Sequence, residues 1–158
     1  MVNHAGGIAM ITFVLAVAIS MGYYQFFYLP QADAVPHYAR NVLHPAKKVS
    51  VSIVKGASLE SNPQHYFPSF VQAGIGDNNE VVWTNNDSIP HTVTSDNKYV
   101  DKISGPFNTI EQQGNVPTGY VMPGKTFDFV FTQIGEYHYH CLPHPYMQGT
   151  VSITQSFS

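Results

Sequence analysis

Apolar and polar residues follow a period of two in several short stretches of this chain. Residues 48–54 and 126–131 alternate cleanly, which predicts strands with one buried face. Residues 80–84, 136–141 and 148–154 also have strand character, with many β-branched and aromatic side chains. Turn-forming Gly, Pro, Asn and Asp residues separate these stretches, so the pattern predicts an antiparallel β-sandwich.

The segments between these strands are less regular. Residues 65–71 are rich in aromatic side chains but contain Pro68, which favours an edge strand or a bulge. Residues 91–95 are expected to form a short strand. Residues 96–118 have little periodicity, and we expect a long irregular excursion there.

The turn at residues 132–135 predicts that strand 126–131 pairs antiparallel with strand 136–141. Along the second of these strands, Tyr137, Tyr139 and Cys141 would share the face that points into the core. His138 and His140 would then point towards solvent.

The first 30 residues have a different character from the rest. No charged residue occurs from Gly6 to Leu29, and a helix of this length would span about 36 Å, enough to cross a bilayer. Aromatic residues crowd its C-terminal end, as at a membrane–water interface. A membrane anchor is therefore expected. A cleaved signal peptide and a buried soluble helix are the alternatives, and the small-x-small sequence 32–34 would suit cleavage.

These patterns divide the chain into three parts. Residues 1–30 form the anchor or signal segment, residues 31–47 a proline-containing linker, and residues 48–158 the β-domain. Arg40, Lys47 and Lys48 follow the apolar segment, which by the positive-inside rule would favour a cytoplasmic β-domain.

The most informative chemistry lies in residues 136–149. The only cysteine, Cys141, is followed by His144 three positions later and by Met147 three positions after that. Thiolate, imidazole and thioether are ligands that suit copper, and a His₂Cys set with a weak axial Met is an electron-transfer geometry. The set lacks one histidine. His91, which follows Pro90 after an Asn-rich turn, is the candidate.

These two motifs together resemble those of the cupredoxins, or type 1 blue copper proteins. Pro90-His91 and the sequence Cys-x-x-His-x-x-Met at 141–147 carry the resemblance, and the short loop is most similar to that of the amicyanins and, more distantly, the plastocyanins. The resemblance covers roughly residues 49–154. It implies a Greek-key β-sandwich or barrel of about eight strands, preceded here by one hydrophobic helix.

The resemblance further implies one mononuclear type 1 copper bound by His91, Cys141, His144 and Met147. It implies a carrier of single electrons between redox partner proteins outside the cytoplasm, rather than an enzyme, and the apolar N-terminal segment would anchor this carrier to the membrane. For the location of the β-domain we give the family resemblance more weight than the positive charges of Arg40, Lys47 and Lys48. We therefore expect the domain to lie outside the cytoplasm. Thr92 stands where the family often has Asn, and it could bond across to the Cys141 loop.

The axial position leaves an alternative open. If Met147 packs over the site without bonding, Met122 is a second candidate for the axial ligand. If neither sulfur coordinates, the open position would suit a mononuclear copper redox enzyme or sensor that acts on a small molecule such as nitric oxide.

Charge and composition narrow the possible partners. Of the 158 residues only 11% are charged, the net charge is −3, and there is no basic stripe, so we expect no nucleic-acid partner. One cysteine excludes an internal disulfide. An apolar patch around His144 is the expected docking face for redox partners, and its residues are Ile89, Pro90, Met122, Pro143, Pro145 and Tyr146.

Overall fold

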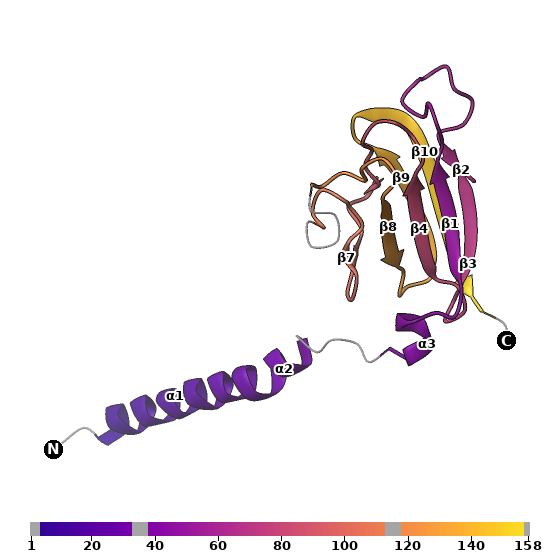
Figure 1. Cartoon of the computed structure of the whole chain (residues 1–158). Coiled ribbons are helices and arrows are strands. Elements are labelled where there is room, and N and C mark those ends of the chain that lie inside the picture. The colour runs from indigo at the N-terminus through magenta and orange to yellow at the C-terminus, as the bar shows by residue number, and fades with distance from the viewer. Residues whose placement is uncertain (1–3, 33–37, 113–117, 157–158) are drawn as a thin grey trace. The chain divides into compact units, whose positions relative to one another are not determined.

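A computed structural model describes residues 4–32, 38–112 and 118–156 of the chain (Figure 1). The chain divides into two compact units, Met1–Pro36 and His37–Ser158. In the first unit α1 (His4–Tyr23), the π-helical turn η1 (Tyr24–Tyr28) and α2 (Leu29–Ala32) follow one another without a break. Within this helix, Met10–Gln31 is long and apolar enough to cross a membrane.

The second unit is a β-sandwich preceded by a short helix, α3 (Arg40–Leu43). Its strands are β1 (Lys48–Ile53), β2 (Tyr66–Phe67), β3 (Phe70–Ile75), β4 (Glu80–Asn85), β5 (Thr94–Ser95), β6 (Val100–Asp101), β7 (Gly105–Pro106), β8 (Thr126–Val130), β9 (Gly135–Cys141) and β10 (His144–Gln155). Two four-stranded sheets, in the orders β2-β1-β4-β8 and β3-β10-β9-β5, face each other. The predicted all-β sandwich with one apolar helix before it is confirmed. The prediction that its strands are all antiparallel is wrong, because β1 pairs parallel with β4 and β3 pairs parallel with β10.

Aromatic rings fill the space between the sheets. Trp83 of β4 is fully buried and contacts Phe127 of β8, while its other edge meets Tyr139 of β9 in the opposite sheet. The period-two pattern places these rings, because alternate residues of each strand face inwards. On β9, Tyr137, Tyr139 and Cys141 are buried and His138 is exposed, which agrees with the prediction; His140 is only partly exposed.

The predicted hairpin between residues 126–131 and 136–141 is wrong. β8 pairs with β4, whereas β9 pairs with β10 and β5 in the other sheet. The connection carries the chain across the core instead of folding it back in one sheet. Thr132 is fixed at this crossing because both its amide and its hydroxyl donate to the buried carboxylate of Asp101.

The predicted excursion holds more structure than its sequence indicates. The described part of residues 96–118 contains the small β6–β7 hairpin, and Phe107 directly after it is fully buried among the core aromatics. Two-residue strands are too short to show a period. The strand expected at 91–95 is likewise reduced to β5, and His91 instead forms an isolated bridge with Val121.

The predicted metal ligands and the point where the chain enters the domain lie at opposite ends of the sandwich. β1 and β4 run parallel, and β9 ends at the opposite end of the sandwich from their starts. We call the end that holds His91, Cys141 and His144 the ligand end. At the other end, the entry end, Asn79 before β4 donates to the carbonyl of Val42 in α3, and Asn41 and Gln155 line one shared hollow. Residues 41–47 of the predicted linker are therefore bonded to the β-domain.

The carboxylate of Asp101 provides a test of the described packing. Burial alone would raise the pKa of this group, but amide donors from Ile103, Thr132 and Ser104 and the Thr132 hydroxyl lower it below its ordinary value. We expect Asp101→Asn to lower the free energy of unfolding by ~2–3 kcal/mol, because its amide would turn hydrogens towards these donors. Urea unfolding at neutral pH measures the loss.

The loss should depend on pH in a defined direction. A carboxyl group whose pKa is lower in the folded state adds stability above its unfolded pKa of about 4, and that contribution disappears as the pH falls through the folded value. The difference in the free energy of unfolding between the wild type and Asp101→Asn should therefore become smaller as the pH falls. Asp128→Asn, at an exposed position on β8, is the control and should cost little at any pH.

Candidate metal centre

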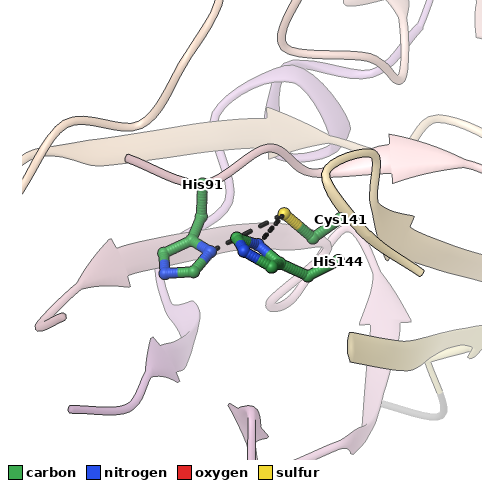
Figure 2. Close-up of side chains that lie close together, drawn as sticks. All are labelled: His91, Cys141 and His144. Atoms are coloured by element: carbon green, nitrogen blue, oxygen red, sulfur yellow. Dashed lines mark hydrogen bonds between the residues drawn. The ribbon is translucent and has the colours of Figure 1, made fainter. Parts of the chain in front are cut away.

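Three of the four predicted ligands come together at the ligand end. One nitrogen each of His91 and His144 and the sulfur of Cys141 lie within 4.8 Å of one another, and Figure 2 shows the three side chains converging. The Cys141 Sγ is 3.6 Å from Nδ1 of His91 and 3.7 Å from Nδ1 of His144. His91 and Cys141 are completely buried, while His144 is partly exposed.

Strand pairing places Cys141 and His144 side by side. Cys141 ends β9 and His144 begins β10, and the two residues are partners in the antiparallel ladder. The ladder is irregular between His144 and Gln148, so the intervening residues bulge away from the regular sheet. Pro143 and Pro145 flank His144 and fix φ on both sides of the ligand.

Thr92 joins His91 to the cysteine strand. Its amide lies 3.4 Å from the Cys141 Sγ, and its hydroxyl lies 3.8 Å from the same sulfur and accepts a 2.8 Å bond from the Leu142 amide. The predicted bond from Thr92 to the Cys141 loop is therefore present. An N–H donor at a thiolate stabilises the charged form, which is the form that binds metal.

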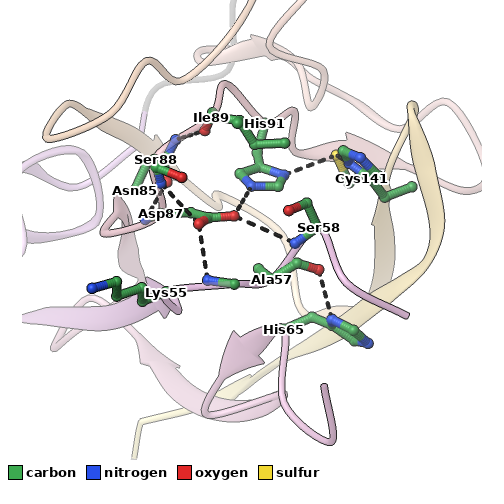
Figure 3. Close-up of polar contacts among 12 residues, drawn as sticks. Lys55, Ala57, Ser58, His65, Asn85, Asp87, Ser88, Ile89, His91 and Cys141 are labelled. Atoms are coloured by element: carbon green, nitrogen blue, oxygen red, sulfur yellow. Dashed lines mark hydrogen bonds and ion pairs between the residues drawn. The ribbon is translucent and has the colours of Figure 1, made fainter. Parts of the chain in front are cut away.

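His91 is oriented from behind by Asp87. Its Nε2 lies 2.9 Å from a carboxylate oxygen of Asp87, so Nδ1 faces the sulfur (Figure 3). Burial lowers the pKa of His91 and favours the neutral imidazole, which is the ligating form. Burial opposes ionisation of Asp87 too, but bonds from His91, Gly56, Ser88 and Ser58 hold its pKa well below the usual range.

The donor set fits a copper ion. Two imidazole nitrogens and one thiolate are the trigonal ligands of electron-transfer copper sites, and here these three atoms lie within 4.8 Å of one another. Met147 is fully buried in the cluster of core residues that also contains Cys141. Met122 is 39% exposed. Axial coordination by Met147 stays a prediction.

Sequence reasoning missed two residues that support the centre. Asp87 was assigned only to a turn, although its spacing of four residues from His91 could have indicated a partner for the histidine. Tyr66 was assigned to an edge strand, yet its ring is buried and its hydroxyl donates to the Thr92 carbonyl at 2.6 Å. No local motif points to this second contact, because 26 residues separate the two groups.

Comparison with known proteins places the centre in context. The model of the copper binding proteins of the plastocyanin/azurin family matches residues 54–154. An amicyanin from Paracoccus denitrificans is 31% identical over 79 residues, which is half of this chain and half of that protein. Two solved structures are also similar. The "Novel Purple Cupredoxin" from Nitrosopumilus maritimus is 27% identical (67% of this chain, 99% of that chain, TM-score 0.49), and an amicyanin from Paracoccus versutus is 23% identical (77% and 94%, TM-score 0.47).

The axial prediction can be tested with a pair of matched substitutions. Met147→Leu keeps a similar volume in the core but removes the thioether, so we expect a higher reduction potential and a shifted absorption spectrum, because Cu(II) loses a donor. Met122→Leu should change neither property. Identical potentials and spectra for Met147→Leu and the wild type would show that Met147 is not a ligand.

Proposed function

Because this chain belongs to the plastocyanin/azurin family of copper-binding proteins, we propose that it carries single electrons between redox partner proteins by means of one type 1 copper. The cofactor is a mononuclear copper. We propose His91, Cys141 and His144 as its three strong ligands and Met147 as its axial ligand.

One observation supports this function above the others. The three donor side chains already lie within 4.8 Å of one another, and two of them are completely buried. Copper supplies a one-electron couple when bound. A buried and braced ligand set has little freedom to move when the charge of the site changes, which is the requirement for rapid electron transfer.

The first experiment loads the purified protein with copper. We expect one Cu(II) per chain and an intense thiolate-to-copper absorption band, with one electron taken up per copper on reduction. Cys141→Ser should lose the band. If Met147 fills the axial position, azide and nitric oxide should leave the spectrum unchanged. A wild-type protein that binds copper but stays colourless would contradict the proposal.

Partners are proposed to dock over the exposed edge of His144. Pro143, Pro145 and Leu142 around it are exposed and uncharged, and weak redox encounters use small interfaces, typically below about 1,200 Å². This face offers an entry point for electrons because His144 is the ligand that is not fully buried.

Leu142→Glu tests the docking face, because the Leu142 side chain is exposed and its bond to Thr92 is made by the backbone amide. A charge in the centre of an apolar contact should slow electron exchange with the partner about tenfold or more, while the copper spectrum changes little. Gln133→Glu adds the same charge in the exposed turn before β9, at the entry end, and is the control. Equal rates for the two variants and the wild type would rule out this face.

We also propose that the apolar helix anchors the protein and that the β-domain lies outside the cytoplasm. The helix contains a stretch long enough to span a bilayer, and aromatic pairs stack near its C-terminal end, Tyr23 on Phe27 and Tyr24 on Tyr28.

Two measurements on the expressed protein test the anchor and its side. The full chain should stay in the membrane pellet after alkaline extraction and keep its intact mass, and protease added outside the cell or spheroplast should digest the β-domain. A smaller, soluble product would instead support a cleaved leader. A protected β-domain would contradict the location.

A further inference from the structure

The three strong ligands form a triangle, and each pair needs a fixed separation. The pair Cys141–His144 is held by the β9–β10 ladder. The pair His91–Cys141 is held by Thr92, which bonds to the sulfur and to the Leu142 amide. The third pair, His91 and His144, has ring centroids 5.3 Å apart, and neither of these two braces links it.

A separate segment spans this third side. Residues 55–58, which we call the strap, leave β1 at the ligand end of the sandwich. The amides of Gly56 and Ser58 donate to the Asp87 carboxylate at 2.9 and 3.3 Å, and the same carboxylate bonds His91 (Figure 3). Gly56 has a φ of +76°, a conformation that a residue with a side chain rarely adopts. The strap is thus bonded to the first histidine through one intermediate residue.

The other end of the connection is Tyr146. Its hydroxyl donates a hydrogen bond to the Ser58 carbonyl, although 88 residues separate the two. The Tyr146 ring lies against His144, with centroids 5.8 Å apart, and against His65, with centroids 5.2 Å apart. His65 in turn contacts the strap, since its Nδ1 is 2.8 Å from the Ala57 carbonyl.

We propose that Tyr146 is a positioning residue which, through its hydroxyl bond to the strap, fixes the separation between His91 and His144. The chain of contacts runs from His144 to the Tyr146 ring, then from the Tyr146 hydroxyl to the Ser58 carbonyl, from the Ser58 amide to Asp87, and on to His91. Every link is a contact between groups that are at least partly buried, so solvent does not replace it freely.

A positioning role and a purely stabilising role of the Tyr146 hydroxyl lead to different expected results. If the hydroxyl only stabilised the fold, its removal would lower stability and leave the copper site as it was. If it fixes His144, its removal should release copper more readily and increase the motion of the His144 ring even in the metal-free protein. The inference rests on the copper site and does not require the electron-carrier function.

The chain provides a matched control. Tyr137 is also on the β9–β10 side of the sandwich, and its hydroxyl donates to a backbone carbonyl, that of Gln133, at 2.8 Å. It lies on β9 four residues before Cys141, towards the entry end. Tyr146→Phe and Tyr137→Phe therefore remove the same kind of bond at opposite ends of the domain.

The experiment compares the two variants as full chains in detergent. Release of copper to a chelator should be about fivefold faster in Tyr146→Phe, the factor expected for one lost hydrogen bond, and unchanged in Tyr137→Phe. In the metal-free proteins, the NMR signals of the His144 ring should broaden only in Tyr146→Phe. Wild-type release from Tyr146→Phe, or equal acceleration in both variants, would overturn the proposal.

A second variant tests the strap without touching Tyr146 or a ligand. Asn62 holds the strap from behind, with its side-chain amide donating to the carbonyls of Gly56 at 3.1 Å and Lys55 at 3.3 Å. Asn62→Ala should also accelerate copper release, and combining it with Tyr146→Phe should add less than the sum of the single effects. Unchanged release from Asn62→Ala, or strict additivity, would contradict a strap that acts as one unit. If Tyr146→Phe does not fold, Asn62→Ala decides alone.

Discussion

The main constraint on this structure is that donor atoms 50 residues apart in sequence must lie within bonding distance of one ion. His91 forms an isolated bridge with Val121 outside the named strands, whereas Cys141 and His144 lie at the paired ends of the two central strands of one sheet, β9 and β10. Hydrogen bonds from Thr92 join the two segments directly. These bonds join only protein groups, and they hold the His91 segment against the strand that carries Cys141.

Two buried carboxylates, at opposite ends of the domain, each hold several segments together by accepting hydrogen bonds. Asp87 receives bonds from His91 and from backbone amides at the ligand end, and Asp101 receives bonds from Thr132 and other amides at the crossing between sheets. A buried charge is tolerated only when donors surround it. In both places a single acidic residue holds several irregular segments that no strand pairing could fix. Strand pairing thus forms the two sheets, and the buried carboxylates hold the irregular segments that connect them.

The parts that could be predicted from sequence are those with a local signal. Period-two alternation located β1 and β8, strand-forming residue types located β9, and the spacing of Cys141, His144 and Met147 identified the metal chemistry. The pairing of β8 with β4 was missed, because a short turn between two alternating strands looks the same whether it joins neighbours or crosses the core. Asp87, Tyr66 and the strap were missed for a related reason. Their roles depend on contacts across 26 to 88 residues, which leave no trace in local periodicity.

The chain enters the β-domain at α3 and leaves it after β10, and both segments border one hollow at the entry end. Both attachment points of the domain are thus on the pole away from His144. A fusion partner, an affinity tag or a linkage to an electrode could be joined to either end of the β-domain without covering the face around His144.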